Sequence, residues 1–301
     1  MRTFHHAAFS TERLARERDL TVSVCLPTRD EAPTIGRIAG SLVELQERQV
    51  VDQVVVVDAA SRDGTGEVAA RAGAEVHDES ALLPELGPVL GKGDAMWRAL
   101  TVLTGDVVCY LDADSEDFGP HFALGVLGPI LCEPAVRYVK AFYRRPFKTA
   151  RAVAPDGGGR VTELTARPLI NLFYPELAGF RQPLAGEIAA RRTLLERLPF
   201  VSGYGVEIAQ LIDAYRAVGP DGLAQVDLDV RQNRHQPLAE LAQMAYEVLG
   251  AVMERLAREG RLDSAVLDDA GPLVLPRDDG VEERPVEAVE RPPLLSLRAA
   301  V

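Results

Sequence analysis

One short stretch, residues 105–118 (GDVVCYLDADSEDF), constrains the fold of this chain more than any other. Residues 106–111 form a mainly apolar run with β-branched and aromatic side chains and a turn signal on each side, which is typical of a strand buried on both faces. Asp112 and Asp114 come directly after this strand. In open α/β sheets ligands bind at the carboxyl ends of such strands. We therefore expect a mostly parallel sheet flanked by helices, with these two carboxylates at its ligand-binding edge.

The pair Asp112 and Asp114 is suited to a hard divalent cation. Carboxylate oxygens bind Mg²⁺ or Mn²⁺, and such an ion usually completes its shell with water and with phosphate oxygens of a substrate. The same tripeptide is also common in simple turns, because Asp bonds its own backbone. The position after the most apolar strand favours a metal site that in turn holds a diphosphate.

Composition argues against several classes of protein. The net charge of -12 disfavours a nucleic-acid-binding protein, whose phosphate contacts need a basic surface. No stretch approaches the roughly 20 apolar residues that span a bilayer, and the first residues lack the apolar core of a secretory signal. Cys25, Cys109 and Cys132 are too scattered for a disulfide framework or a zinc site. We expect a cytoplasmic enzyme without nucleic-acid or membrane partners.

Strand and helix patterns alternate along the first half of the chain. Residues 21–26 and 53–57 are apolar strand runs, each followed by a polar loop and a helical pattern, which predicts parallel pairing with right-handed crossovers. Arg29 in the first loop and Asp58 in the second therefore lie at the edge where nucleotides bind. There is no G-x-G-x-x-G after the first strand and no P-loop, so a dinucleotide dehydrogenase and a P-loop enzyme are disfavoured.

Two glycine-containing segments are candidate anion sites. Lys92 lies between Gly91 and Gly93 at a helix start, where it can neutralise a phosphate, although loop lysines are often only solvated. Further on, three glycines precede Arg160 and Thr162. Their guanidinium and hydroxyl groups can hold a phosphate or carboxylate by charge-assisted hydrogen bonds.

A third glycine-containing turn surrounds Tyr204, just before a long helical pattern. Such a turn can direct Tyr204 and Glu207 into a cleft. The competing interpretation of Glu207 is a buried acid that caps the helix. Both interpretations are compatible with the residues alone.

The chain resembles the glucosyl-3-phosphoglycerate and mannosyl-3-phosphoglycerate synthases, which are retaining GT-A glycosyltransferases. The resemblance covers residues 21–250 and rests on motifs in the same order: PTRDEAPTIG, VVVDAASRDGT, GKGDAMWRAL, YLDADSEDF, VKAFYRRP, GGGRVTELTARPL, QPLAGE, FVSGYGVEI and NRHQPLAEL. It implies a GT-A (Rossmann-like) α/β fold with a C-terminal acceptor-binding part. It also implies a divalent metal, a nucleoside diphosphate sugar as donor and 3-phosphoglycerate as acceptor.

The resemblance assigns roles to individual positions. The implied nucleotide-sugar-binding residues are Pro27, Arg29, Glu31, Asp58, Ser61, Gly91, Lys92, Asp112 and Ala113. The implied acceptor-binding residues are Gly159, Arg160, Val161, Thr162, Tyr204 and His235. The implied catalytic residues are Lys92, Asp114, Glu207 and Arg231, and the implied metal ligands are Asp112, Asp114 and His235.

Two positions depart from the family pattern. The family usually has an apolar residue where Arg29 stands, so the preferred base of the donor stays open between guanine and uracil. The family also tends to have a metal-binding histidine where this chain has Asn233, with His235 two residues further on. Either His235 replaces it through a shifted loop, or the metal keeps an extra water. Because imidazole is the better ligand, we favour His235.

The resemblance implies transfer of mannose or glucose from GDP-mannose, GDP-glucose or UDP-glucose to the 2-hydroxyl of 3-phosphoglycerate. The alternatives are a metal-dependent sugar nucleotidyltransferase and a non-catalytic sugar-nucleotide-binding protein. We expect an N-terminal arm (1–20), a nucleotide-sugar-binding half (21–145), an acceptor-binding half (146–260) and a tail (261–301) that is extended or packs on a partner. A homodimer is the expected assembly.

Overall fold

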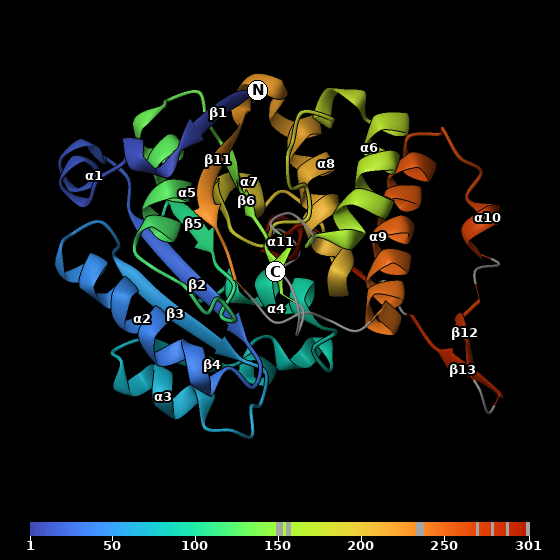
Figure 1. The fold of residues 1–301 in the computed structure, drawn as a ribbon, viewed down its shortest axis with the longest axis horizontal. Coiled ribbons are helices and arrows are strands. Elements are labelled where there is room, and N and C mark those ends of the chain that lie inside the picture. Colours follow the sequence, from blue (N-terminus) through green and yellow to red (C-terminus); the bar gives the residue numbers. More distant parts are fainter. Residues whose placement is uncertain are drawn as a thin grey trace.

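An eight-stranded sheet forms the centre of the molecule (Figure 1). The computed structural model describes residues 1–148, 153–154, 158–232, 238–268, 271–277, 280–286 and 289–298. Across the sheet the strands are ordered β1-β11-β6-β9-β5-β2-β3-β4. Their bounds are Arg2–His5 (β1), Val22–Thr28 (β2), Gln53–Asp58 (β3), Glu75–Asp78 (β4), Val107–Tyr110 (β5), Tyr138–Arg144 (β6), Ile188–Arg191 (β9) and Leu223–Val230 (β11). Only β9 runs antiparallel to its neighbours in this sheet, so the predicted mostly parallel α/β fold is confirmed.

Helices cover both faces of the sheet, because alternate residues of the buried strands point to opposite sides. Cys25 packs in the core on one side, while Val24 and Leu26 pack in the core on the other. The first side is covered by α4 (Lys92–Ala99), α6 (Arg167–Phe173), α8 (Val206–Val218) and α9 (Leu238–Arg258). The second side is covered by α1 (Thr11–Glu17), α2 (Ala32–Glu47), α3 (Thr65–Arg71) and α5 (His121–Cys132).

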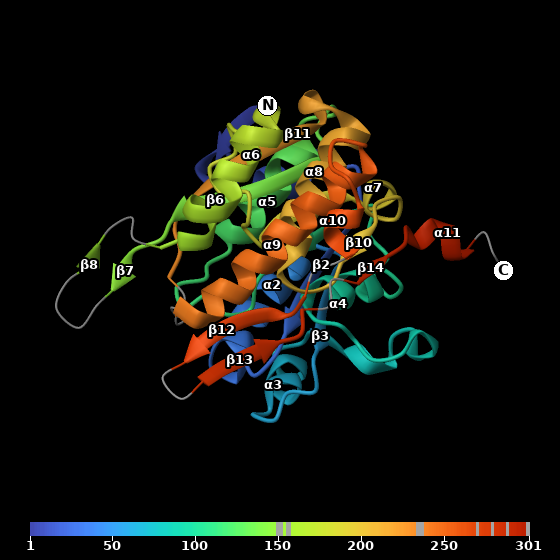
Figure 2. The same ribbon diagram turned by 90° about the vertical axis from the view of Figure 1, so that its right-hand side faces the viewer.

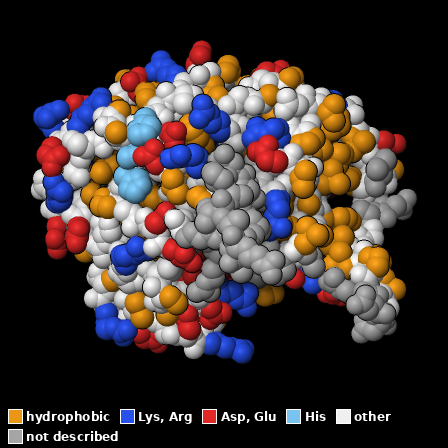
Figure 3. Space-filling view, viewed as in Figure 1, with side chains coloured by type: hydrophobic (Ala, Val, Ile, Leu, Met, Phe, Trp, Pro, Cys, Tyr) orange, Lys and Arg blue, Asp and Glu red, His pale blue; other side chains and the backbone are white. Residues whose placement is uncertain are grey.

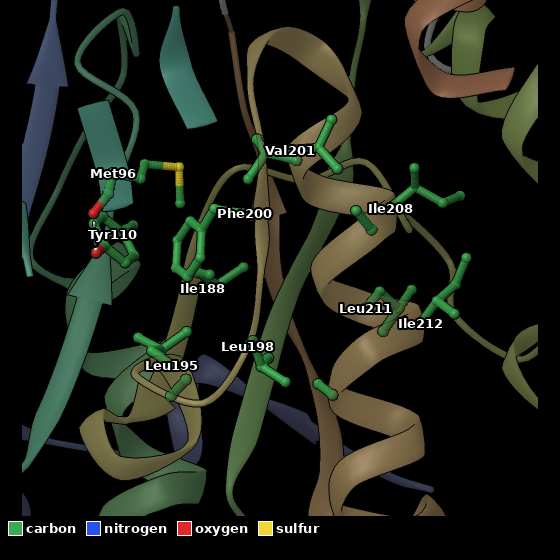
Figure 4. Packing of buried hydrophobic residues seen from close by; sticks show 14 of the residues in the cluster. Met96, Tyr110, Ile188, Leu195, Leu198, Phe200, Val201, Ile208, Leu211 and Ile212 are labelled. Atoms are coloured by element: carbon green, nitrogen blue, oxygen red, sulfur yellow. Dashed lines mark hydrogen bonds between the residues drawn. The ribbon is translucent and has the colours of Figure 1, made fainter. Parts of the chain in front are cut away.

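The first core fixes the elements that carry the site. Figure 4 shows Met96 of α4, Tyr110 of β5 and Ile188 of β9 around Phe200, with Ile208 of α8 further along the same core. The Tyr110 hydroxyl donates a hydrogen bond of 2.7 Å to the Met96 carbonyl. The start of α4 and the start of α8 are thereby held beside the end of β5.

The last part of the chain returns to the body of the molecule (Figure 2). Beyond α9 lie α10 (Ala265–Asp268), the antiparallel pair β12 (Leu273–Arg277) and β13 (Gly280–Arg284), and then β14 (Glu290–Arg291) and α11 (Leu294–Arg298). Strand β14 pairs antiparallel with β10 (Phe200–Val201). The indole nitrogen of Trp97 donates a hydrogen bond of 2.9 Å to the Pro292 carbonyl. These described tail residues therefore pack against their own chain.

The remaining short elements are α7 (Arg192–Leu195), β7 (Phe147–Lys148) and β8 (Val153–Ala154). Strand β2 continues beyond the predicted run 21–26, through Pro27 to Thr28, and Thr34 lies inside α2. The Thr34 hydroxyl donates a hydrogen bond of 2.6 Å to the Ala113 carbonyl, so it ties α2 to the Asp-x-Asp turn. In the part of the chain that the structure describes, no helix combines the length and apolarity needed to cross a membrane.

Candidate active site

A cavity of about 830 Å³ opens at the carboxyl ends of the central strands. Its walls also include the turn before α6, the start of α8 and one face of α9. It is lined by most of the residues that the sequence singled out, namely Pro27, Arg29, Glu31, Gly91, Lys92, Asp112, Ala113, Asp114, Gly159, Arg160, Val161, Thr162, Tyr204, Glu207 and Arg231. The fold thus brings segments more than 200 residues apart in sequence to one cavity.

Two expected site residues that the structure describes do not line this cavity. Asp58 and Ser61 lie in the loop after β3, where the Ser61 hydroxyl donates to the Asp58 carboxylate and accepts a hydrogen bond of 2.8 Å from the Asp30 amide. Their hydrogen bonds connect the loop after β2 to the loop after β3. The neighbouring residue Ala59 lines the cavity. His235 lies outside the described residues, as does Asn233.

The two aspartates after β5 are held by cationic side chains. The Lys92 ammonium lies 2.6 Å from Asp112 Oδ1, and the Arg231 guanidinium lies 2.9 Å from Asp112 Oδ2. A second guanidinium nitrogen of Arg231 donates to Asp114. Burial alone would raise the pKa of Asp112, but Lys92 and Arg231 outweigh it and hold that pKa well below its usual range. Asp112 is therefore an anion at every ordinary pH.

Lys92 joins this pair to Glu207. Its ammonium lies 2.8 Å from Glu207 Oε1, and Asp112 and Glu207 together raise the pKa of Lys92 against the opposing effect of burial. The backbone before it requires glycine, since Gly91 has φ of +87°. A Cβ on Gly93 would lie 1.8 Å from the Val201 carbonyl oxygen. Both glycines therefore position Lys92 by letting the start of α4 approach the loop before α8.

Arg231 organises the floor of the cavity and is 2% exposed. It forms an ion pair of 2.5 Å with Glu187, at an angle unfavourable for a hydrogen bond. It also donates to the Ser115 hydroxyl at 3.0 Å and to the Tyr143 hydroxyl at 2.7 Å. Burial raises the pKa of Glu187, and Arg231 opposes that shift. The buried ion pair thus keeps this guanidinium fixed beside the two aspartates.

Sequence reasoning did not identify Glu187, Tyr143 and Ser115 as site residues. Glu187 comes just before β9, and the antiparallel insertion of β9 between β5 and β6 places it under Arg231. Gly186 packs so closely that a Cβ there would lie 2.4 Å from Asp112 Oδ1. The glycine-acid pair in QPLAGE was the available signal, but its meaning depends on an antiparallel strand that the local pattern did not reveal.

The glycine segment before α6 also lies in the cavity wall. Gly159 has φ of +76°, and a helix begins at Arg160 and passes through a π-helical turn, Thr162–Ala166, into α6. Thr162 is buried at 6% exposure, and its side chain lines the cavity together with Arg160. Tyr204 is partly exposed, and its backbone amide donates a hydrogen bond of 2.6 Å to Glu247 of α9.

Comparison with known proteins places this site in a family. Residues 23–126 match the family model described as glycosyl transferase family 2. The chain is 42% identical over 305 residues to the glucosyl-3-phosphoglycerate synthase of Petrotoga mobilis, covering 98% of this chain and 94% of that protein. The chain belongs to the glucosyl-3-phosphoglycerate and mannosyl-3-phosphoglycerate synthase family. The expected resemblance is confirmed.

Solved structures of this synthase family superimpose on the whole chain. The crystal structure of mannosyl-3-phosphoglycerate synthase from Rubrobacter xylanophilus matches with a TM-score of 0.90 and 50% identity, over 98% of this chain and 96% of that one. A glucosyl-3-phosphoglycerate synthase from Mycobacterium tuberculosis, in complex with Mn²⁺, UDP and glucosyl-3-phosphoglycerate, matches with a TM-score of 0.87 and 38% identity, over 99% and 100% of the two chains. The predicted GT-A fold is thereby confirmed.

The residues at the end of β5 fit a divalent cation. Asp112 and Asp114 offer ionised oxygens, which are the ligands that Mg²⁺ and Mn²⁺ prefer. Their described partners, Lys92 and Arg231, are cations that can instead pair with phosphate oxygens of a ligand. This part of the cavity therefore has the charges needed to accept a metal and a diphosphate together.

Proposed function

We propose that this chain is a retaining hexosyltransferase that moves a hexose from a nucleoside diphosphate sugar to the 2-hydroxyl of 3-phosphoglycerate. The observation that carries the proposal is one cavity lined both by the Asp112 and Asp114 pair, with its cations, and by the Arg160 and Thr162 turn. The first set suits a metal-bound diphosphate, and the second suits a small anionic acceptor. The related Mycobacterium tuberculosis structure contains UDP and glucosyl-3-phosphoglycerate together with Mn²⁺.

On the donor side, Asp112 and Asp114, with His235, would hold Mg²⁺ or Mn²⁺, which offsets the charge that grows on the departing diphosphate. Lys92 and Arg231 add fixed positive charge in the same place. Pro27, Arg29 and Glu31 line the part of the cavity at the end of β2, where we assign the base and ribose. Asp58 and Ser61 act there by shaping the loops.

On the acceptor side, Gly159, Arg160, Val161 and Thr162 hold the phosphate or carboxylate of 3-phosphoglycerate, and Tyr204 borders the sugar. Glu207 is mostly buried and paired with Lys92, so its carboxylate is not free to attack the anomeric carbon. It orients the sugar or the acceptor instead. Retention then follows a same-face route, in which the leaving phosphate accepts the proton of the acceptor hydroxyl.

A donor panel tests the proposal. The protein is mixed with 3-phosphoglycerate, Mg²⁺ and, in separate reactions, GDP-mannose, GDP-glucose or UDP-glucose, and the diphosphate and the glycosylated product are quantified. We expect a nucleoside diphosphate and one equivalent of glycosyl-phosphoglycerate to appear together with at least one donor, and only when the acceptor is present. Release of pyrophosphate from a nucleoside triphosphate, or binding without product from any donor, would contradict the proposal.

The assembly and compartment belong to the same proposal. Leu164 and Leu172, near α6, are 78% and 72% exposed. Figure 3 shows apolar side chains gathered on this side of the molecule. We infer that a second copy covers them in a homodimer, which light scattering in solution can measure.

Cys25 and Cys109 are buried free thiols, in keeping with a reducing cytoplasm. We also propose that residues 21–145 bind the donor and that residues 146–260 bind the acceptor, as expected from the sequence.

A further inference from the structure

A cluster of three polar side chains lies at the edge of the sheet formed by β1 and β11. His5 Nε2 lies 3.3 Å from Asp229 Oδ1, and His6 Nε2 lies 2.7 Å from Asp229 Oδ2. One possible ligand atom from each of the three residues lies within 4.8 Å of the other two. Figure 3 shows histidine side chains together with acidic groups on this open face of the molecule. None of the three residues lines the cavity of the candidate active site.

The backbone holds these side chains in place. Strand β1 pairs parallel with β11, with His5 opposite Asp227, and the register of β11 shifts between Asp227 and Val230. Asp229 lies within this irregularity in a left-handed conformation, with φ of +67°, which is uncommon for a residue other than glycine. Its amide donates a hydrogen bond of 2.9 Å to the Asp227 carboxylate. The Asp229 side chain is thereby directed at both histidines.

The spacing is that of a metal site. Zinc binds imidazole nitrogen and carboxylate oxygen at about 2.0–2.2 Å in a tetrahedron, in which neighbouring ligand atoms are roughly 3.3 Å apart. Here each histidine nitrogen contacts a different oxygen of Asp229, at 3.3 and 2.7 Å, and one ligand atom from each residue lies within 4.8 Å of the other two, so small side-chain rotations would bring three ligand atoms to this spacing. Two imidazoles and one carboxylate leave the fourth position to water or to His121, whose ring centroid lies 4.8 Å from that of His6.

We propose that His5, His6 and Asp229 form a second metal site, separate from the catalytic one, that takes a borderline transition-metal ion such as Zn²⁺. Nitrogen ligands favour Zn²⁺, Ni²⁺ or Co²⁺ over Mg²⁺ and Mn²⁺, which suit the oxygen-rich Asp112 and Asp114 pair. The ion would join the first strand to the end of β11, two residues before Arg231. Its expected effect is structural, because it fastens the edge of the sheet that ends at the active-site arginine.

Metal binding would change the tautomer of each imidazole. The Asp229 carboxylate can only accept hydrogen bonds, so both Nε2 atoms carry hydrogen when no ion is bound. Coordination through Nε2 moves the ring hydrogen of each neutral imidazole to Nδ1. For His5 this breaks the hydrogen bond of 3.2 Å that its Nδ1 accepts from the Ala7 amide. His5 should therefore be the weaker imidazole ligand, and His6 the stronger.

The test is a Zn²⁺ titration of untagged, metal-stripped full-length protein by calorimetry in excess Mg²⁺, with thermal unfolding measured in parallel. We expect H6A and D229N each to weaken one Zn²⁺-binding event by at least about tenfold, and H5A to weaken it less. Asn tolerates the left-handed conformation, so D229N keeps the backbone intact. Zn²⁺ should raise the Tm of the wild type but not that of H6A or D229N.

The matched control is H77A. His77 Nε2 lies 2.7 Å from Glu75 Oε1, so it forms the same kind of histidine-carboxylate pair without a second imidazole. This variant should bind Zn²⁺ as the wild type does. Equal numbers of Zn²⁺ ions bound with equal affinity by wild type, H6A and D229N would overturn the proposal, whatever the donor panel shows.

Discussion

At the level of single residues, the candidate site contains more anionic than cationic groups. Asp112, Asp114 and Glu187 surround Arg231, while Lys92 pairs with Asp112 and with Glu207. Four carboxylates therefore share two cations within the described contacts. An excess of negative charge at the end of β5 would favour binding of a divalent cation. The same excess would repel a metal-free diphosphate, so metal and nucleotide should bind together.

Arg29 is the residue most suited to select the base of the donor. Arg29 lines the cavity at the end of β2 and is exposed. An arginine fork can donate two hydrogen bonds to O6 and N7 of guanine, whereas uracil offers no such pair. We expect R29L to lower kcat/KM for GDP-sugars by roughly tenfold or more relative to UDP-glucose. The exposed Arg62, which does not line the cavity, provides the control R62L, and an unchanged donor ratio in R29L would contradict this role.

Lys140 gives the site a pH-dependent contribution to stability. It is fully buried and donates a hydrogen bond of 2.8 Å to the Ala185 carbonyl, and burial lowers its pKa to about 8, against the raising effect of Glu207. Between about pH 8 and the usual lysine value, the unfolded chain binds more protons than the folded one, so stability should rise with pH.

The variant K140M removes this contribution. Between about pH 8 and the usual lysine pKa, the unfolding free energy of the wild type should rise relative to that of K140M by up to about 3 kcal/mol. Below about pH 8 the difference between the two proteins should be constant. Denaturant unfolding at a series of pH values measures it. If the unfolding free energies of the two proteins changed in parallel with pH throughout the window, burial would not lower the pKa of Lys140.

At the level of secondary-structure elements, β9 is the strand that builds the site. Sequence patterns predicted β2, β3 and β5 because each is an apolar run. Strand β9 has four residues, Ile188–Arg191, and the preceding segment contains a glycine and a charged residue, so the local pattern gave no strand signal. Its antiparallel pairing depends on β5 and β6, which are distant in sequence. Glu187 and Tyr143 could therefore not be recognised as neighbours.

Gly186, just before β9, offers a direct test of this element. A methyl group there would lie 2.4 Å from Asp112 Oδ1, so G186A should push the carboxylate away from Lys92 and Arg231. We expect kcat/KM for hexose transfer to fall by at least about tenfold, because misplacement of this order is costly in catalysis.

The matched control is G40A in α2, where a Cβ would meet nothing within 4 Å. This change should leave turnover unaltered and stabilise the helix by about 0.5–1 kcal/mol. Thermal unfolding and steady-state kinetics separate the two effects. Normal turnover in G186A would show that close packing of β9 does not position Asp112.

At the scale of the whole molecule, the final described segment completes the core around α4. Asp94 is fully buried and accepts hydrogen bonds of 2.8 Å from Arg291, and the buried Trp97 is bonded to Pro292. Leu294 of α11 is 3% exposed. Asp94 and Trp97 belong to the helix that begins at Lys92, so the tail helps to hold this helix, and with it Lys92, in place.

A truncation after residue 288 should therefore destabilise the protein. It exposes Trp97, the only tryptophan in the chain, and leaves Asp94 without Arg291. We expect a lower Tm and a red shift of tryptophan fluorescence. The variant R291M keeps the strand and should lower the Tm without the full red shift. An unchanged Tm and spectrum in the truncated protein would contradict the packing of the tail.

The sequence predicted the fold class, the strand that carries the Asp-x-Asp pair and many of the residues that line the cavity, because local patterns and motif order can be recognised without the structure. It did not predict the placement of β1 beside β11 or of β14 beside β10, since those pairings join the ends of the chain. Asp58 and Ser61 were expected beside the nucleotide, yet they bond each other in the loop. The metal-binding role expected of His235 stays a prediction.

The central claim is that Asp112 and Asp114 hold a divalent cation that in turn holds the donor diphosphate. The most direct measurement is calorimetric binding of GDP and of UDP to the wild type and to D114N, each with Mn²⁺ and with EDTA. We predict that the wild type binds at least one of the two nucleotides strongly only with Mn²⁺, and that D114N loses this metal-dependent binding. Equally strong binding by the wild type in EDTA, or by D114N in Mn²⁺, would contradict the claim.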